Sequence, residues 1–395
     1  MYLNRTLSQA LGQALDAFPA VLLTGPRQSG KTTFLQHELG ERYNYVSFDD
    51  PLEREFARTD PNGFLRRFDE RPALLDEVQY VPELLSYIKL RIDAAPGQLG
   101  RWLLTGSQQF ALMQQLGESL AGRVAILELL PFSAVEHPPP ELGAAIGAGG
   151  YPVPALHPER SDLWARSYVR TYLERDVRQL SQVADLRAFE RFLGLIAAQH
   201  GQELKKAPLA RDCGLSQPTI ANWISVLEAS YVVTLLSPYF RNYGKRLIKS
   251  PKLYFIDSLI ACTLTRQPNP QAALAGPMGG ALLEGWVVVE AVKAFTNRGL
   301  TPDIYFWRSQ DGLEVDLLVQ IGTRLHPVEI KRTATPTPRH VEPLSRLRAI
   351  IGDQAAEAGL LVCSVERERP MPHGNRAMPW QEFPAWIGHA LEAAR

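Results

Sequence analysis

Residues 21–33 read Val-Leu-Leu-Thr-Gly-Pro-Arg-Gln-Ser-Gly-Lys-Thr-Thr. A short apolar run, the spacing Gly-x-x-x-x-Gly-Lys-Thr and the first turn of an expected helix follow one another without interruption. Gly25 and Gly30 can adopt backbone angles that other residues avoid, so successive backbone N–H groups can curl around an anion. The helix expected to begin near Lys31 adds the positive end of its dipole. The stretch therefore predicts a phosphate-binding loop between a strand and a helix.

The residue types in this loop suit a nucleoside triphosphate with its metal ion. Lys31 is expected to reach the β- and γ-phosphates, and the Thr32 hydroxyl is expected to ligate Mg²⁺. ATP and Mg²⁺ are therefore the predicted cofactors. The predicted nucleotide-binding residues are Gly25, Pro26, Arg27, Gln28, Ser29, Gly30, Lys31, Thr32 and Thr33.

An acidic pair follows the next strongly apolar run. Residues 73–75 read Ala-Leu-Leu and are followed by Asp76 and Glu77. In phosphate-loop enzymes the first acid at the end of such a strand orients Mg²⁺. A glutamate directly after it is placed to polarise the attacking water. We therefore assign Asp76 to the metal and Glu77 to the role of general base.

Further polar residues are candidates for sensing the state of the nucleotide. The predicted strand 102–105 ends in Gly-Ser, so Ser107 is the candidate beside the γ-phosphate, with Thr105 in reserve; an ordinary polar turn is the alternative. Arg123 and Arg175 are candidate arginine fingers, and the alternative for each is a surface ion pair. If either arginine acts in a neighbour's site, the enzyme works as a homo-oligomer.

Composition limits the other functions of the chain. The 395 residues are 45% hydrophobic and 21% charged, with 42 Lys+Arg against 42 Asp+Glu. This length indicates more than one domain, and the zero net charge means that any nucleic-acid surface must be a local patch. The three cysteines lack metal-ligand spacing, which predicts reduced thiols. Without a signal peptide or a bilayer-spanning apolar run, a cytoplasmic protein is expected.

Residues 209–223 have the spacing of a helix-turn-helix around Gly214. Ser216 is expected to cap the second helix. The apolar residues expected on the buried face of that helix are Ile220, Trp223, Ile224 and Leu227, which leaves Gln217, Thr219 and Asn222 to face outward. Such side chains suit base edges or phosphates.

Two strand-like runs, 231–236 and 252–256, follow this pair of helices. The residues between them include the basic set Arg241, Lys245, Arg246 and Lys249. This layout predicts a winged helix whose basic wing can follow DNA phosphates. The outward helix face, however, has no arginine or lysine between Ser216 and Glu228. A protein-binding module or a spacer therefore stays open as the alternative.

The C-terminal third has the residue pattern of a metal-dependent nuclease. A helix that begins near Ala281 carries Glu284, and predicted strands at 304–308, 314–319 and 327–331 carry Asp316, Glu329 and Lys331. Strand alternation places Glu329 and Lys331 on one face, beside Asp316. The three acids could hold Mg²⁺, and the lysine could orient water or offset phosphate charge. Glu290 and Lys293 are expected on a solvated helix face.

These motifs together resemble a widespread prokaryotic family of uncharacterised AAA-type ATPases. Its members join an AAA-like domain to a C-terminal domain of unknown function related to the restriction-endonuclease fold. The resemblance rests on residues 23–33, 75–79, 104–107, 120–123, 149–152 and 172–176, together with Glu284, Asp316 and 329–331. The family carries Ser where this chain has Gln108, so the chain departs from the family pattern directly beside the sensor candidate Ser107. The resemblance implies ATP hydrolysis.

We therefore expect an α/β protein with three folds in succession: a P-loop NTPase (AAA-type) parallel sheet, a winged helix-turn-helix and a PD-(D/E)xK nuclease-like α/β domain. The expected bounds are 1–140 for the ATPase core, 141–190 for a helical lid or connector, 191–270 for the winged helix and 271–395 for the nuclease-like domain. Two functions stay open. One is an ATPase that binds or processes DNA; the other is an ATP-gated regulatory switch or chaperone-like protein that binds protein partners and cleaves nothing. A repressor that uses only the winged helix is a third, weaker reading.

Overall fold

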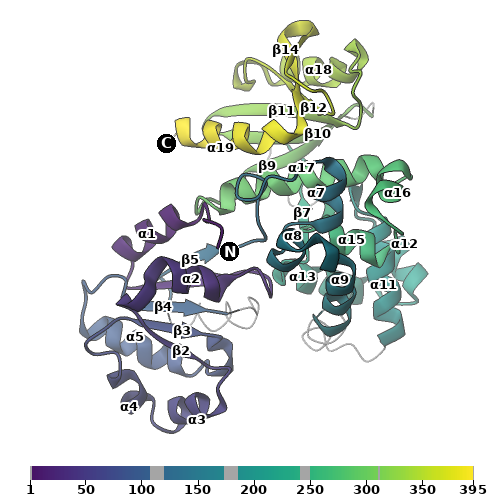
Figure 1. The fold of residues 1–395 in the computed structure, drawn as a ribbon. Helices are drawn as coiled ribbons and strands as arrows, with labels where there is room; N and C mark the ends of the chain where they lie inside the picture. Colours follow the sequence, from purple (N-terminus) through teal and green to yellow (C-terminus); the bar gives the residue numbers. More distant parts are fainter. Residues whose placement is uncertain (1, 107–119, 173–185, 241–249, 310–311, 395) are drawn as a thin grey trace. The chain divides into compact units, whose positions relative to one another are not determined.

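The computed structural model describes residues 2–106, 120–172, 186–240, 250–309 and 312–394 (Figure 1). The chain forms two compact units. Unit 1 contains Met1–Pro131 with two short later segments, Ala229–Tyr231 and Thr296–Leu300. Unit 2 contains the remainder of the chain. Within the described part, no helix is long and apolar enough to cross a membrane.

Unit 1 is built on a five-stranded sheet in the order β2-β3-β4-β1-β5, and every pairing in it is parallel. The fully apolar runs of the sequence form its centre, because β1, β3 and β4 are buried over their whole length. The strands are β1 (Ala20–Thr24), β2 (Asn44–Ser47), β3 (Ala73–Asp76), β4 (Trp102–Thr105) and β5 (Val124–Glu128). The predicted parallel α/β fold is confirmed.

Helices cover both faces of this sheet (Figure 1). On one face Leu11 and Phe34 pack with Val21 and Leu103, and on the other Phe64 and Ile88 pack with Leu22. Alternate residues of β1 therefore enter opposite layers, as strand geometry requires. The helices are α1 (Ser8–Ala17), α2 (Lys31–Leu39), α3 (Pro51–Thr59), α4 (Pro61–Arg66) and α5 (Leu84–Ala94).

The first part of unit 2 is mainly helical, with a small antiparallel sheet in the order β6-β8-β7. Phe189 and Phe192 each pack edge to face against Trp223 in its core. The helices are α7 (Leu142–Ala148), α8 (Pro152–Leu156), α9 (Ser161–Tyr168), α11 (Leu186–Ala198), α12 (Lys206–Cys213), α13 (Gln217–Ala229), α15 (Ser258–Leu264) and α16 (Pro270–Ala275). The strands are β6 (Gln202–Glu203), β7 (Val233–Leu236) and β8 (Lys252–Phe255).

The turn between α12 and α13 has the local geometry that its sequence predicts. Gly214 adopts a left-handed conformation with φ of 71°, which glycine tolerates without strain. The Ser216 hydroxyl accepts a hydrogen bond from the Thr219 backbone N–H at 3.2 Å, so the predicted cap forms. The four residues predicted for the inner face of α13 are all buried, whereas Gln217 and Asn222 are exposed.

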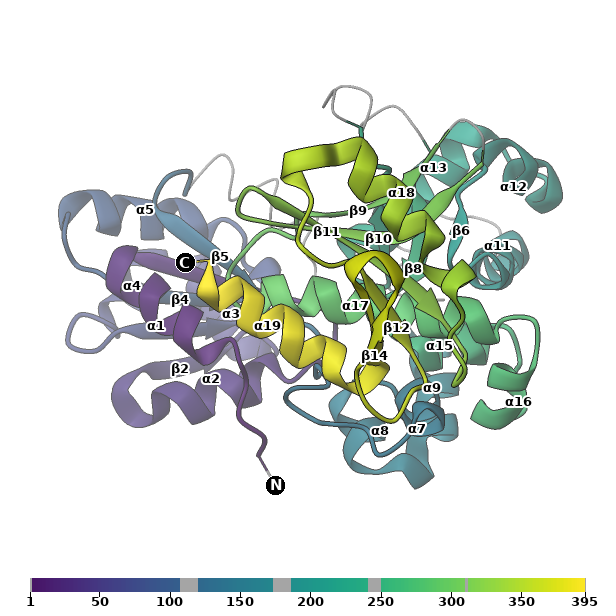
Figure 2. The same cartoon turned by 90° about the horizontal axis from the view of Figure 1, so that it is seen from above.

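The second part of unit 2 is a mixed six-stranded sheet in the order β13-β14-β12-β11-β10-β9, with helices packed against it (Figure 2). Strands β9, β10 and β11 are antiparallel neighbours, and β11 pairs with β12 in parallel. The strands are β9 (Ile304–Arg308), β10 (Glu314–Ile321), β11 (Arg324–Lys331), β12 (Leu360–Cys363), β13 (Arg369–Met371) and β14 (Asn375–Pro379). The helices are α17 (Gly279–Thr296), α18 (Glu342–Ile351) and α19 (Phe383–Ala393).

One expectation for α17 is wrong. Glu290 and Lys293 do not lie on a solvated face, because only 2% and 5% of their surfaces are exposed. Lys293 Nζ forms an ion pair with Glu290 at 2.8 Å and donates to the Phe132 backbone oxygen at 2.8 Å. Glu290 also accepts from the Ala134 backbone N–H. The pair is a buried, fully hydrogen-bonded element of unit 2, the arrangement that buried charges require.

Candidate functional site

The phosphate-loop sequence forms a tight turn between β1 and α2. Gly25 and Gly30 have φ of 143° and 92°, and Gln28 is also left-handed with φ of 63°. A Cβ atom on Gly25 would collide with the Leu129 backbone oxygen, so only glycine fits there. The first turn of α2 begins at Lys31, and its free N–H groups with the helix dipole favour an anion at this point.

Lys31 is held inside this loop. Its Nζ donates to the backbone oxygens of Gly25 at 3.0 Å and Pro26 at 2.9 Å, and its side chain is buried. Burial lowers the pKa of Lys31 to about 8; the charges of Glu77 and Asp76 oppose this shift, and that of Arg27 adds to it. A nearby phosphate would favour the charged ammonium, since an opposite charge raises the pKa of a lysine.

The Asp76 carboxylate faces the start of α2. Its Oδ2 accepts hydrogen bonds from the Thr32 hydroxyl at 2.8 Å and from the Tyr45 hydroxyl at 3.1 Å. Its Oδ1 is buried and has no hydrogen-bond partner among the described residues. Burial, and then the Asp76 charge, raise the pKa of Tyr45 to about 12, so Tyr45 is a donor at neutral pH. Thr32 and Asp76 thus meet as their predicted shared role requires.

Glu77 follows with a left-handed backbone, φ 58° and ψ 44°. A non-glycine residue in this region is uncommon, and such strain clusters at functional sites. The Gln79 amide donates a short hydrogen bond to the Glu77 carboxylate, which fixes its orientation. Glu77 also lies near enough to Lys31 for its charge to raise the pKa of that lysine.

Three other oxygens around the loop share the property of Asp76 Oδ1, since they are buried without a hydrogen-bond partner among the described residues. Within the described residues, the hydroxyls of Thr24, Ser29 and Thr105 are buried and lack hydrogen-bond partners. Buried polar atoms are normally paired, so a group of such atoms at one sheet edge calls for an explanation. Hydroxyl and carboxylate oxygens, an anion-binding loop and a lysine are the donor and acceptor set that fits a Mg²⁺–nucleotide complex.

Of the remaining sensor and arginine-finger candidates, only Arg123 lies within the described residues. Arg123 immediately precedes β5, and its backbone oxygen accepts from Ala20 N at the start of β1, so it lies at the sheet edge opposite the loop. Its side chain forms an ion pair with Asp93 at 2.6 Å. Arg123 therefore cannot serve its own chain's loop and stays a candidate only for a neighbour's site. Ser107 and Arg175 lie outside the described residues.

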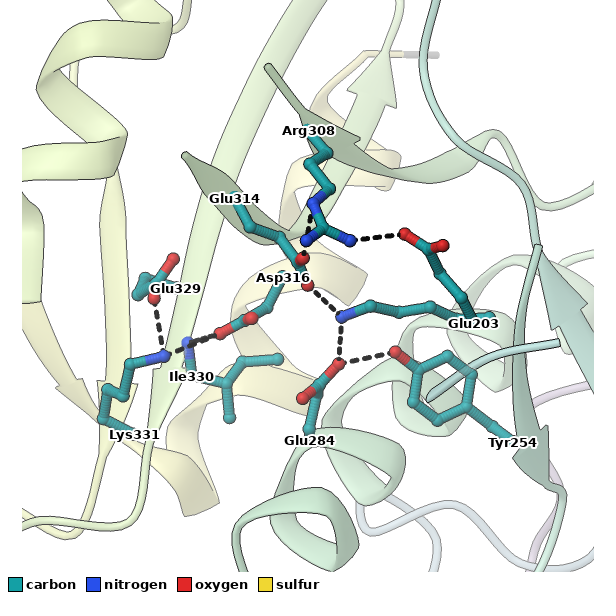
Figure 3. A network of polar contacts seen from close by, with 10 residues as sticks. Glu203, Tyr254, Glu284, Arg308, Glu314, Asp316, Glu329, Ile330 and Lys331 are labelled. Atoms are coloured by element: carbon teal, nitrogen blue, oxygen red, sulfur yellow. Dashed lines mark hydrogen bonds and ion pairs between the residues drawn. The ribbon is translucent and has the colours of Figure 1, made fainter. Parts of the chain in front are cut away.

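A second group of charges gathers in unit 2, and we call it the carboxylate–lysine cluster (Figure 3). It contains Glu284 of α17, Glu314 and Asp316 of β10, Glu329 and Lys331 of β11, and Lys252 of β8. Lys331 Nζ lies 3.2 Å from Asp316 Oδ2 and 2.6 Å from Glu329 Oε1. The strand residues predicted to share a face therefore do meet.

Lys252 makes the second bridge in the cluster. Its Nζ lies 2.8 Å from Glu284 Oε1 and 2.5 Å from Glu314 Oε1. Tyr254 also donates to Glu284 Oε1 at 2.6 Å. Beside this bridge, Arg308 pairs with Glu203 at 2.7 Å and lies 3.8 Å from Glu314 Oε2.

Burial sets the pKa values of this cluster. Burial and the Asp316 charge raise the pKa of Glu329 to about 8, against the opposing effect of Lys331. Burial and Asp316 also raise the pKa of Glu284, which Lys252 opposes. Burial works against the charge of both lysines, but the carboxylates around them outweigh it and raise the pKa of each. The two lysines are cations at any physiological pH.

The predicted metal set does not assemble as a metal site in this arrangement. Across the described ranges, no three Asp, Glu, His or Cys side chains gather closely enough to hold an ion. Sequence reasoning missed Lys252 and Glu314, whose partners lie far away in the chain. It also missed Tyr45, although strand alternation places it on the same face as Ser47, which pairs with Asp76. The basic set at 241–249 lies outside the described residues.

Three family models match successive stretches of the chain. Residues 17–137 match the AAA domain. Residues 140–271 match a domain of unknown function (DUF8612), and residues 279–383 match another (DUF4143). The AAA match covers the five-stranded sheet and the loop, and it supports ATP binding and ATPase activity at the general level of that family.

Relatives extend over most of the chain. The uncharacterised protein Rv2008c of Mycobacterium tuberculosis is 34% identical over 337 residues, which is 85% of this chain and 75% of that protein, and Mb2031c of Mycobacterium bovis matches equally. Among solved structures, a Walker-type ATPase of Pyrococcus abyssi is 19% identical, with a TM-score of 0.46 over 65% of this chain and 94% of that one. This chain therefore belongs to the uncharacterised prokaryotic family of AAA-type ATPases that its motifs resemble, with an AAA domain at its N-terminal end and a domain of unknown function at its C-terminal end.

Proposed function

We propose that the protein is a Mg²⁺-dependent ATPase that hydrolyses ATP to ADP and phosphate. One observation carries the proposal: the Thr32 hydroxyl and the Asp76 carboxylate meet at 2.8 Å beside the loop, with Asp76 Oδ1 buried and, among the described residues, unpaired. These are the two side chains that hold Mg²⁺ in phosphate-loop enzymes. The AAA domain match supports the same conclusion.

Each residue of the site then has a separate task. The loop N–H groups and Lys31 bind the phosphates, while Thr32 and Asp76 hold Mg²⁺, which neutralises phosphate charge when bound. Glu77, kept in place by Gln79, accepts the proton of the attacking water. Thr105 at the end of β4 is paired in register with Leu23, so its hydroxyl lies beside the loop and can report on the γ-phosphate.

We assign DNA as the partner of the remaining domains. The order helix, strand, two helices and hairpin strands from α11 to β8 supports a winged helix, and Gln217 and Asn222 are exposed on its second helix. The order α17-β9-β10-β11-α18-β12, with acids on α17, β10 and β11, supports a restriction-endonuclease-like domain. Nucleotide state in unit 1 would then control DNA binding by these domains.

A second candidate is an ATP-gated switch that binds protein partners and cleaves nothing. The observation in its favour is the carboxylate–lysine cluster, where Asp316 and Glu329 share Lys331, and Glu284 is held by Lys252. Carboxylates neutralised by lysines have lost most of their attraction for a divalent ion. The two candidates agree on ATP hydrolysis and differ only in what the C-terminal domains bind.

Lys31→Ala tests the ATPase proposal. We expect loss of nucleotide binding, because the variant removes the ammonium that is expected to reach the β- and γ-phosphates. Fluorescent ATP-analogue binding and phosphate release measure it. Lys89→Ala, which changes a lysine on α5, is the control and should bind as the wild type does. Hydrolysis at the wild-type rate by Lys31→Ala would refute the proposed site.

A further inference from the structure

Lys252 Nζ lies between the carboxylates of Glu284 and Glu314. The carboxylate oxygens lie 2.8 Å and 2.5 Å from it, and one of them also accepts from Tyr254. Lys252 is 5% exposed, and Glu284 belongs to a different element, the helix α17. The lysine thus enters the cluster from β8 of the three-stranded sheet, whereas the acids come from α17 and β10.

We propose that Lys252 is a built-in cation that keeps divalent metal out of the carboxylate–lysine cluster, and that the cluster binds a divalent ion only when Lys252 leaves it. A cation in this position satisfies the acids without coordinating a phosphate or activating water. Held in this arrangement, Glu284 and Glu314 are not available to a divalent ion. The inference goes beyond the proposed ATPase and does not depend on it.

The other carboxylates of the cluster are also engaged. Lys331 bridges Asp316 and Glu329, and Asp316 Oδ2 accepts from the Ile330 backbone N–H at 2.9 Å as well. In contrast, Glu329 Oε2 is buried and has no hydrogen-bond partner among the described residues. Glu329 thus keeps one acceptor available for a cation. Lys252 is the counter-charge that Glu284 and Glu314 share, and Arg308 adds a second, more distant cation for Glu314.

Removal of this lysine would leave Glu284 without a cation and Glu314 with only the more distant Arg308. Breaking a buried ion pair at one partner is strongly destabilising, because the remaining charge is uncompensated. A divalent ion with oxygen ligands is the chemically suited replacement. A cavity of about 400 Å³ leads to the site, lined by Lys252, Glu284, Glu314, Arg308 and Lys205. The cavity therefore gives an ion in solution a route to Glu284 and Glu314.

Mn²⁺ titration without nucleotide tests the proposal in the full-length protein. Free Mn²⁺ is measured by electron paramagnetic resonance for the wild type, Lys252→Met and the double variant Lys252→Met/Glu284→Gln. We expect Lys252→Met to bind Mn²⁺ at least about tenfold more tightly than the wild type, since a carboxylate pair that lacks its cation attracts a divalent ion. The double variant should lose this gain.

Lys205→Met is the matched control, because Lys205 is an exposed lysine in the same cavity, and it should behave as the wild type does. Circular dichroism verifies that each variant is folded. Folded Lys252→Met without tighter Mn²⁺ binding overturns the proposal. The proposal is also overturned if the wild type binds Mn²⁺ tightly and Glu284→Gln abolishes that binding. This comparison does not need Lys252→Met, so it tests the proposal even if that variant fails to fold. Because nucleotide is absent, neither result depends on ATPase activity.

Discussion

Lys31 is an ammonium buried against its own loop, and the free protein is destabilised by it. Its pKa falls from 10.5 to about 8 because burial disfavours the charge. A basic group whose pKa is lower in the folded state than in the unfolded state reduces the free energy of unfolding at any pH where both states are protonated. The cost is therefore complete below about pH 8 and is relieved as the pH rises from about 8 towards 10.5.

This linkage predicts a pH-dependent difference between the wild type and Lys31→Met. Without nucleotide at pH 7, the free energy of unfolding of Lys31→Met should exceed that of the wild type by up to about 3 kcal/mol, because the variant buries no charge. Lys31→Met should therefore unfold at a higher denaturant concentration. The difference should shrink as the pH approaches 10. Urea unfolding of the two proteins at pH 7, 8, 9 and 10 measures it. A difference that stays constant over this range would contradict the assigned pKa.

Tyr45 orients the Asp76 carboxylate from outside the loop. Its hydroxyl donates to the Asp76 oxygen that Thr32 also contacts, so Oδ1 is the oxygen left for the proposed Mg²⁺. Tyr45→Phe removes this bond and keeps the ring. We expect the Mg²⁺ concentration for half-maximal ATPase activity to rise by about tenfold, since hydrogen bonds to charged groups contribute about 1.5 kcal/mol.

The control for this prediction is Tyr43→Phe. The Tyr43 hydroxyl donates to the Gly100 backbone oxygen, remote from Asp76, so its loss should leave the Mg²⁺ requirement unchanged. Steady-state phosphate release over a Mg²⁺ series compares the three proteins. An unaltered Mg²⁺ requirement in Tyr45→Phe would show that Asp76 needs no such support.

At the scale of elements, α17 depends on close approach to a buried histidine. His200 Nδ1 accepts from the Phe255 backbone N–H, and burial lowers the pKa of His200 to about 4, so the ring is neutral. A Cβ atom on Gly285 would collide with this ring. Glycine at this helix position is therefore a packing requirement and not a weakness of the helix.

Gly285→Ala should accordingly destabilise unit 2 by about 1–3 kcal/mol, the usual cost of overpacking a core. Gly280→Ala in the same helix is the matched control, since a Cβ there would meet no atom within 4 Å. That control should be neutral or stabilising, because alanine is the better helix former. Thermal unfolding monitored by circular dichroism compares them. Equal melting temperatures for the two variants would contradict the packing argument.

Most elements were predictable where one periodicity dominated the sequence. The strands 102–105 and 304–308 appear with the predicted bounds, and the apolar run from Ala73 forms β3, because short apolar or β-branched runs between turn residues have few other folds. Alternation also placed Glu329 and Lys331 beside Asp316. The loop site was predictable to the level of Thr32 and Asp76, since its spacing is nearly unique.

The remainder depends on contacts between distant segments. Nothing local to Lys252 reveals that it meets Glu284, because α17 and β8 are brought together only by the fold. The burial of Glu290 and Lys293 likewise depends on the backbone of Phe132 and Ala134. Charges on a helix are usually solvated, so the sequence alone favours the wrong face whenever a loop covers them.

At the scale of the whole molecule, the DNA and protein-partner functions make different predictions for ATP turnover. If unit 1 drives DNA-binding domains, added duplex or single-stranded DNA should raise the ATPase rate several-fold, and the effect should weaken with salt because phosphate contacts release counterions. The rate is measured with and without DNA at two salt concentrations. No response to DNA at either concentration would favour the regulatory switch that binds protein partners.

Lys31→Ala supplies the control for this assay. The variant should show no turnover in either condition, and DNA-dependent phosphate release at the wild-type rate would again refute the β1–α2 site. The variants Gln217→Ala and Asn222→Ala, on the exposed face of α13, test whether that helix contacts DNA. Stimulation of both variants to the wild-type extent would exclude this face from DNA binding.

The central claim is that this chain binds ATP at the β1–α2 loop and splits it with the Asp76–Glu77 pair. Parallel measurement of ATP binding and single-turnover hydrolysis in the wild type and Glu77→Gln tests it most directly. We predict that Glu77→Gln binds ATP with the wild-type affinity and hydrolyses it at least about a hundredfold more slowly, because it loses only the general base. Hydrolysis by Glu77→Gln at the wild-type rate would contradict the account.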